Sequence, residues 1–258
     1  MTDDRVVIEK VEVHGKKFRV TTGEGEYLFS EETVIRYGLF KGCSFAKSRF
    51  EEIVDEENYQ GLLNKAIKFL AHQERSVSEV EEYLRKRDAD ESVIARAIER
   101  LTAYGYLNDS RYAALVLDYA FSTRKGPRYL ENRLRLKGVA PEIIAEVMNR
   151  YDEAREEEIV AGITDEFLRK NAGIPKLKLQ RKLYQKLIRD GFSREIATRF
   201  VNNADYPPVD EVSLRAEIAK LIDGADMPSG GEKQRIIKKM TAKGYSYHDI
   251  IAAMDENE

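Results

Sequence analysis

Lysine and arginine side chains recur at three places in the chain where helices are expected, and their chemistry is the most informative in the sequence. Positive charges of this kind would complement an acidic groove on a protein, or the phosphates of bound DNA. They could instead be ordinary solvated helix faces, because the helix dipole favours cations near helix C-termini. The candidate contact residues are Arg124, Lys125, Arg128, Arg135, Lys178, Lys182, Lys186, Arg189, Lys239 and Lys243.

Recurrence favours the functional interpretation of these cations. At helical spacing, Arg128 and Arg135 are expected to face solvent, and so are Lys182, Lys186 and Arg189. Chance solvation would not repeat the same placement in successive segments. We therefore expect the cations to form a basic stripe that contacts a partner.

The residues that usually carry catalysis show no comparable arrangement. His14, His72 and His248 lie far apart, and none has metal-ligand spacing to a second ligand. Cys43 is the only cysteine, which excludes an internal disulfide. The glycine-containing segments at 23–25 and 228–233 do not match a phosphate-binding loop and are interpreted as turns. We expect no enzymatic activity, no metal and no cofactor.

A sequence pattern that returns four times indicates which elements position the cations. Its anchor residues Asp88, Gly138, Gly191 and Gly244 are separated by 50, 53 and 53 residues. Apolar residues stand eight and four positions before each anchor: Val80 and Leu84, Leu130 and Leu134, Leu183 and Leu187, Ile236 and Met240. A fixed period of this size is typical of an array of similar units, and such arrays are usually binding surfaces.

The pattern predicts a mostly α-helical protein, an elongated array of tandem three-helix repeats preceded by a small β-rich N-terminal module. The expected module spans residues 1–57, and the expected repeats span 58–105, 106–152, 153–206 and 207–258. Residues 5–29 show strand patterns, and helical patterns follow from about residue 58. In the later repeats a first helix (108–123, 153–171, 210–222) precedes the basic second helix (127–137, 176–190, 231–243). Glycine at an anchor suits the left-handed residue that ends a helix.

Composition limits the environment in which the chain works. Of 258 residues, 34% are charged and 42% hydrophobic, and the formal net charge is −3. No apolar run is long enough to span a bilayer, and no secretory signal opens the chain. We expect a cytoplasmic protein without a membrane partner, and a monomer.

The most distinctive string is Gly105-Tyr106-Leu107-Asn108-Asp109-Ser110-Arg111-Tyr112-Ala113. Gly105 would end one helix, and Asn108 or Asp109 would cap the next. This is a packing role at the joint between the first two repeats.

This string and its neighbours resemble the RecX family. The resemblance also rests on Ser78, Glu82 and Leu84, and on Gly126-Pro127-Arg128 followed by Leu130, Leu134 and Lys137-Gly138. It covers roughly residues 60 to 254. It implies a regulator of the RecA recombinase that binds in the groove of the RecA–DNA filament, with single- or double-stranded DNA as a further partner. It also implies restraint of ATP hydrolysis and strand exchange, and hence a role in homologous recombination, DNA repair and the SOS response.

Two other classes of function remain open. A DNA-binding helical-repeat protein without an obligatory protein partner would use the same basic stripe. The net acidic charge and the lack of aromatic residues interleaved with the cations count against it. A purely structural scaffold predicts no recurrence of basic residues.

Overall fold

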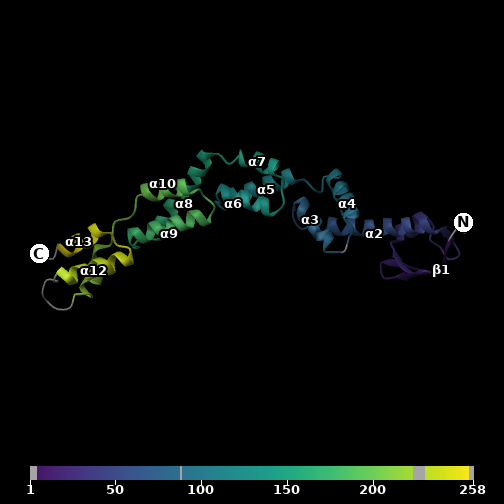
Figure 1. The fold of residues 1–258 in the computed structure, drawn as a ribbon, viewed down its shortest axis with the longest axis horizontal. Coiled ribbons are helices and arrows are strands. Elements are labelled where there is room, and N and C mark those ends of the chain that lie inside the picture. Colours follow the sequence, from purple (N-terminus) through teal and green to yellow (C-terminus); the bar gives the residue numbers. More distant parts are fainter. Residues whose placement is uncertain (1–4, 88, 223–229, 256–258) are drawn as a thin grey trace. The chain divides into compact units, whose positions relative to one another are not determined.

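The computed structural model describes residues 5–87, 89–222 and 230–255. Within these ranges the chain forms four strands and thirteen helices (Figure 1). It divides into two compact units, Met1–Tyr112 and Ala113–Glu258, and the division falls within helix α5 (Asp109–Ser122). The prediction of a mostly α-helical protein with a small β-rich N-terminal module is confirmed.

The N-terminal module is a four-stranded antiparallel sheet with strand order β3-β2-β1-β4. Its strands are β1 (Arg5–His14), β2 (Lys17–Thr22), β3 (Gly25–Phe29) and β4 (Ser44–Ala46). Val20 pairs with Val11 on one side and with Tyr27 on the other. Strand β4 was not predicted from the sequence, because a three-residue strand carries too little pattern to be recognised.

Helix α1 (Glu31–Tyr37) follows the sheet and is capped at both ends. The Ser30 hydroxyl accepts a hydrogen bond from the backbone N–H of Thr33, and Gly38 ends the helix with a φ of 66°. Only glycine adopts this left-handed conformation without strain.

Helix α2 (Lys47–Leu70) begins well before the expected helical start near residue 58. Its first turns lie on the sheet, where Phe50 and Ile53 are fully buried in the core of the module. The acidic residues between and after these positions concealed the helical spacing of the apolar ones. The expected boundary at residue 57 therefore falls within a continuous helix.

Glu57 of α2 joins this helix to the sheet and to α1. Its buried carboxylate accepts hydrogen bonds from Lys17 Nζ at 2.8 Å, Ser30 Oγ at 2.8 Å and Thr33 Oγ1 at 2.7 Å. Burial by itself raises the pKa of Glu57, but these donors outweigh it, so the pKa lies below its ordinary value.

The second half of α2 packs with α3 (Val77–Arg85) and α4 (Glu91–Ala103) around a separate apolar core. Ser76 caps α3 in a capping box with Glu79. Asp90 occupies the N-cap of α4, although its side chain makes no capping hydrogen bond. The anchor Asp88 lies outside the described residues.

The joint before α5 has the predicted chemistry. Gly105 has a φ of 73°, and Asn108 Oδ1 accepts from the backbone N–H of Arg111, so Asn108 is the cap. Asp109 has a different role, since its Oδ1 accepts from the backbone N–H of Val77 at the start of α3. The interpretation of this string as a packing joint is consistent with both contacts.

Among the described residues, eight helices lie wholly within the second unit. They are α6 (Pro127–Leu136), α7 (Pro141–Met148), α8 (Glu153–Lys170), α9 (Lys176–Arg189), α10 (Arg194–Asn203), α11 (Glu211–Ala219), α12 (Gly230–Lys243) and α13 (Tyr247–Asp255). All eight apolar residues of the repeat pattern are fully buried, as their shared register predicted. Gly138, Gly191 and Gly244 each have positive φ after a basic second helix. The repeat boundaries at residues 57, 105, 152 and 206 stay predictions.

Candidate functional site

The carboxyl end of α9 docks on the amino end of α6. Arg128 N–H donates to the carbonyl oxygen of Gly191 at 3.0 Å, and Gly126 N–H donates to that of Asp190 at 2.8 Å. A Cβ atom on Gly191 would lie 2.5 Å from the backbone nitrogen of Tyr129, and one on Gly126 would lie 2.4 Å from the Gly191 carbonyl carbon. Both glycines are therefore required by the close approach of two backbones.

The same junction returns one repeat later. Leu177 is the second residue of α9, as Arg128 is of α6, and its N–H donates to the carbonyl oxygen of Gly244 at 3.1 Å. Gly191 and Gly244 each end their own helix, and their carbonyl oxygens also accept from an amide in the first turn of the preceding basic helix. This brings the cations of consecutive basic helices close together.

A buried carboxylate neutralises two of the predicted contact residues. Asp190 accepts from Lys125 Nζ at 2.6 Å and from Lys186 Nζ at 2.7 Å, and its side chain is almost fully buried. Burial by itself raises the pKa of Asp190, but the two lysines outweigh it and hold the pKa below its ordinary value. The Tyr151 hydroxyl also holds this segment by donating to the carbonyl oxygen of Lys125. The expectation that Lys186 faces solvent is wrong, because it is half-buried against Asp190.

Three other candidates form ion pairs at the surface. Arg124 contacts Glu166 at 2.6 Å, Arg135 contacts Glu131 at 2.5 Å, and Lys243 contacts Glu217 at 2.8 Å. Lys170 and Arg124 together lower the pKa of Glu166 to about 2. The remaining five form no ion pair with any residue in the described ranges, and all five are exposed: Arg128, Lys178, Lys182, Arg189 and Lys239.

The junction of α6 and α9 opens into a groove of about 380 Å³, called here the α6–α9 groove. Its cationic lining is Arg128, Arg133 and Lys137 of the α6 segment and Arg189 of α9. Its other lining residues include Tyr129, Asn132, Leu136 and Ile188, and none of the described residues that line it is acidic. The groove therefore presents concentrated positive charge beside apolar surface.

A second groove of about 750 Å³ lies at the junction of α9 and α12. Lys178, Arg181 and Lys243 line it, but so does Glu217, which pairs with Lys243. This α9–α12 groove therefore has a smaller net positive charge than the α6–α9 groove. Arg135, Lys182 and Lys239 line neither groove and stand separately on the surface.

Glu156 lies in the first turn of α8, and its side chain is buried. Burial raises the pKa of Glu156, although the backbone N–H of Ser193 and the charges of Arg128 and Arg199 oppose this shift. Its Oε1 has no hydrogen-bond partner among the described residues.

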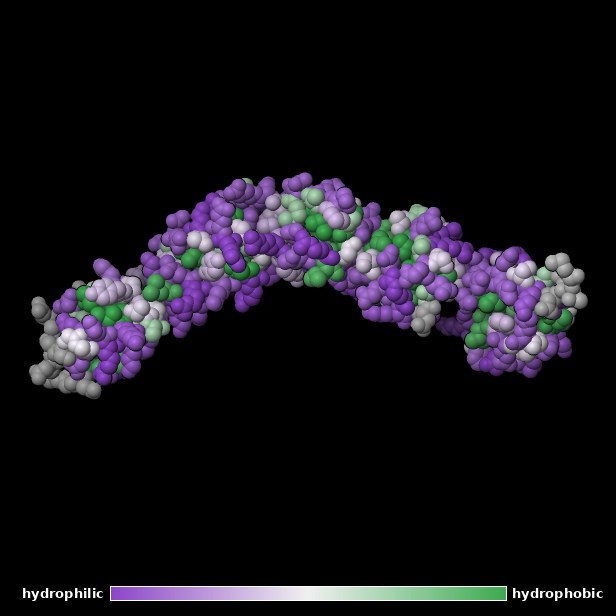
Figure 2. Space-filling model, in the orientation of Figure 1, coloured by the Kyte–Doolittle hydropathy of each residue, from purple (hydrophilic) through white to green (hydrophobic). Residues whose placement is uncertain are grey.

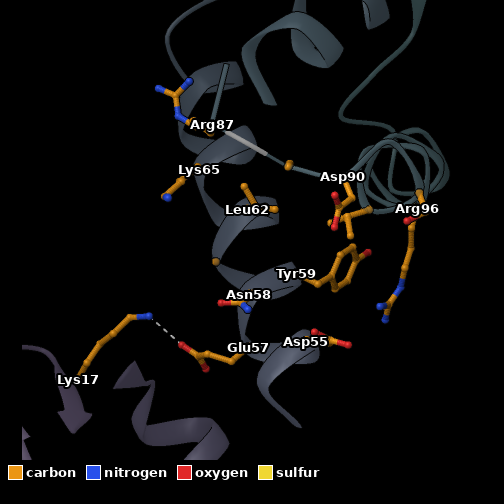
Figure 3. Close-up of a pocket in the computed structure, with 14 residues that line it drawn as sticks. Lys17, Asp55, Glu57, Asn58, Tyr59, Leu62, Lys65, Arg87, Asp90 and Arg96 are labelled. Carbon is orange, nitrogen blue, oxygen red and sulfur yellow. Dashed lines mark hydrogen bonds and ion pairs between the residues drawn. The ribbon is translucent and has the colours of Figure 1, made fainter. Parts of the chain in front are cut away.

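A cavity of about 680 Å³ in the first unit lies between α2 and α4 (Figure 3). Lys65 and Arg87 lie on one side of it, and Asp90 lies near Arg96 on the other. Arg96 is already used structurally, since it contacts Glu56 at 2.8 Å and stacks 3.8 Å from the Tyr59 ring centroid. Both signs of charge line the cavity, and no histidine, cysteine or paired base supplies a nucleophile there.

No metal-binding cluster of three histidine, cysteine, aspartate or glutamate residues occurs in the part of the chain that the structure describes. In the same ranges no helix is long and apolar enough to cross a membrane. On the face shown in Figure 2, hydrophilic side chains cover most of the surface of each unit, and apolar patches lie between them.

Seven groove residues were not among the predicted contacts: Tyr129, Asn132, Arg133, Leu136, Lys137, Ile188 and Gly191. The exposure of Leu136 could have been predicted from the sequence. It is apolar but lies outside the repeat register that buries Leu130 and Leu134. Arg133 stacks with its guanidinium carbon 5.8 Å from the Tyr119 ring centroid, a contact that spacing along one helix does not predict.

Comparison with known proteins adds the family. Models described as the first and the second three-helix domain of RecX match residues 63–101 and 108–148. The regulatory protein RecX of Listeria monocytogenes serotype 4b (strain CLIP80459) is 33% identical over 242 residues, which are 90% of this chain and 89% of that protein. RecX of Streptococcus pneumoniae serotype 19F (strain G54) is 29% identical over 258 residues, 96% of this chain and 98% of that protein.

Two solved structures have a similar fold. A crystal structure of regulatory protein RecX covers 77% of this chain and 100% of its own, with a TM-score of 0.58 at 19% identity. The crystal structure of RecX from Lactobacillus salivarius covers 57% of this chain and 96% of its own, with a TM-score of 0.52 at 25% identity. With identity above 30% over most of both chains in the Listeria protein, and with both helical-domain models matched, this chain belongs to the RecX family of regulatory proteins.

Proposed function

We propose that this protein modulates the RecA recombinase, mainly by inhibition, through binding to the RecA–DNA filament. Membership of the RecX family supports the choice of partner. The α6–α9 groove, with four cations and no acidic residue among its described lining, is the observation that carries the proposal on this chain.

The exposed cations of α6, α9 and α12 are the proposed contact surface. The protein as a whole is weakly acidic, with a formal net charge of −3, so attraction to an anionic partner must come from local patches. Arg128, Lys178, Lys182, Arg189 and Lys239 are free to supply it, since no described residue forms an ion pair with them. Lys125 and Lys186 instead stabilise the junction that holds the helices together.

Further parts of the proposal follow from the partner. The protein acts by binding rather than by catalysis, so it needs no cofactor, and it works as a monomer in the cytoplasm, where RecA is found. Inhibition slows ATP hydrolysis and strand exchange by RecA. DNA held in the filament is a second source of negative charge for the same cations.

RecA-catalysed ATP hydrolysis on single-stranded DNA, titrated with this protein, tests the proposal. A triple variant, Arg128→Glu with Arg135→Glu and Lys182→Glu, is expected to need at least about tenfold more protein for the same inhibition. Lys186 is left intact, because an acidic residue there would face buried Asp190. Lys16→Glu with Lys68→Glu and Lys220→Glu is the control, since these lysines are exposed and lie outside both grooves.

Equal inhibition by the triple variant and wild type, at equal thermal stability, would contradict the proposed surface. Binding to naked DNA provides the second readout. If wild type binds naked DNA as tightly as RecA-coated DNA at physiological salt, with a steep salt dependence, the protein is a direct DNA binder.

A further inference from the structure

Leu136 is the most exposed of the large apolar side chains in the described residues, with 85% of its surface accessible. It ends α6, where Leu130 and Leu134 of the same helix are fully buried. It also lines the α6–α9 groove, together with half-buried Tyr129 and Ile188. The α6–α9 groove, with four cations in its lining, therefore also contains an uncovered apolar surface.

From this combination we infer that the α6–α9 groove holds an acidic segment of a protein partner, with one apolar side chain of that segment seated against Leu136. The inference rests on the proposed function and specifies the chemistry that the groove recognises. Positive charge selects the carboxylates of the segment, and Leu136 selects its apolar residue.

The dimensions of the groove suit a short peptide. Arg128 and Lys137 lie nine residues apart along the α6 segment, a rise of about 14 Å in a helix. An extended peptide covers that length with about four residues. Arg189 enters from α9, so cations flank the segment on more than one side.

The lining favours a protein segment over a nucleic acid. Single-stranded nucleic acids bind through aromatic side chains on which bases stack, in addition to cations along the backbone. Tyr129 is the only aromatic residue among those that line the groove, and it is half-buried. Leu136 and Ile188 give a phosphate backbone nothing to contact, whereas they match an aliphatic side chain.

The α9–α12 groove provides an internal comparison. It is built on the same backbone junction, but Glu217 lies in its lining and pairs with Lys243. An acidic segment would be repelled by that carboxylate. We therefore expect the α6–α9 groove to bind such a segment and the α9–α12 groove to bind it more weakly.

Fluorescence anisotropy of the full-length protein tests the inference with three labelled probes. The first is a short polyglutamate peptide with a single central leucine, the second has serine in place of that leucine, and the third is oligothymidylate. The leucine peptide is expected to bind at least about tenfold more tightly than the serine peptide. Leu136→Ser should remove this preference, and Arg128→Glu with Arg189→Glu should abolish binding of both peptides.

Matched variants separate the groove from general surface effects. Val212→Ser changes an apolar residue of α11 that is 79% exposed, and Arg181→Glu changes the α9–α12 groove. Both are expected to bind the leucine peptide within about twofold of wild type. Melting curves of all variants should coincide, since every changed side chain is exposed.

Equal binding of the two peptides, or an unchanged preference in Leu136→Ser, would overturn the inference. Oligothymidylate binding that is tighter than that of the leucine peptide and is lost in Leu136→Ser would also overturn it, in favour of a nucleic-acid groove. The RecA ATPase assay distinguishes failure of this inference from failure of the proposed function. If the peptides fail but Arg128→Glu with Arg189→Glu still relieves RecA inhibition, only the inference is wrong.

Discussion

The carbonyl oxygen of Gly191 accepts a hydrogen bond from the backbone N–H of Arg128 at 3.0 Å, across the junction between α9 and α6. Gly244 and Leu177 repeat the relationship at 3.1 Å between α12 and α9. An anchor glycine therefore sets the spacing of consecutive basic helices. The groove beside Gly191 is a direct product of this repeated packing contact.

Gly191→Ala is predicted to destabilise the protein strongly. Gly191 has a φ of 95°, and the new Cβ atom would lie 2.5 Å from the backbone nitrogen of Tyr129. Gly105→Ala is the matched control, since Gly105 has a φ of 73° but no atom within 4 Å of a Cβ. Left-handed strain alone costs about 1–2 kcal/mol, and the overlap should add about 1–3 kcal/mol in Gly191→Ala. Urea denaturation measures the free energy of unfolding of both variants. Equal losses would contradict the close backbone approach between Gly191 and Tyr129.

Leu134→Ala and Leu136→Ala are predicted to have opposite consequences, although the residues are two positions apart. Leu134 is fully buried, so an unfilled cavity should cost about 2–5 kcal/mol of stability. Leu136 is 85% exposed, and its truncation should change stability by less than about 0.5 kcal/mol. Leu136→Ala should nevertheless weaken filament binding. A large stability loss in Leu136→Ala would show that α6 packs differently.

Glu57→Gln is predicted to lower stability at neutral pH by about 2 kcal/mol, because hydrogen bonds to a buried charged group are lost. The pKa of Glu57 in the folded protein lies below its ordinary value of 4.5. Its ionised form thus stabilises the fold above pH 4.5, and this contribution is lost as the pH falls through the folded pKa. Urea denaturation at pH 7 and at acidic pH should show the variant and wild type converging. A constant difference at all pH values would contradict this.

Glu156→Gln is predicted to change the pH dependence of stability in the opposite direction to Glu57→Gln. Burial raises the pKa of Glu156 above 4.5, so ionisation is less favourable in the folded than in the unfolded protein. The resulting stability advantage is present below pH 4.5 and is lost as the pH rises through the folded pKa. At pH 7 the neutral amide should therefore equal or exceed wild type in stability, with no advantage under acidic conditions. Strong destabilisation at pH 7 would mean that the Glu156 carboxylate is satisfied by a partner.

The repeat fold was predictable because its signals are local. Fully buried Leu84, Leu134, Leu187 and Met240 follow from a shared register, and the helix ends follow from Ser30, Ser76 and the anchor glycines. The early start of α2 was not predictable in this way, because buried Glu57 looks like one more residue of an acidic run. Only its tertiary donors Lys17, Ser30 and Thr33 explain its position. The elongation expected from the repeat number stays a prediction.

The candidate site was predictable in part. Sequence alone identified the basic helices, and Arg128 and Arg189 do lie together in one groove. The i,i+4 spacing of Lys186 and Asp190 could have revealed their ion pair. Sequence alone did not separate Lys125 from the exposed cations, because a junction between distant segments brings Asp190 to it. Pairing across 65 residues leaves no periodic signal in the sequence.

The affinity of the double variant Arg128→Glu with Arg189→Glu for RecA-coated single-stranded DNA tests whether the α6–α9 groove contacts the filament. Lys16→Glu with Lys68→Glu makes the same change in net charge at exposed positions outside the groove. At matched thermal stability and physiological salt, the groove variant is predicted to bind at least about tenfold more weakly than wild type, with a flatter salt dependence. The control should bind within about twofold of wild type. Equal affinities of the groove variant and the control would contradict the claim that the α6–α9 groove contacts the filament.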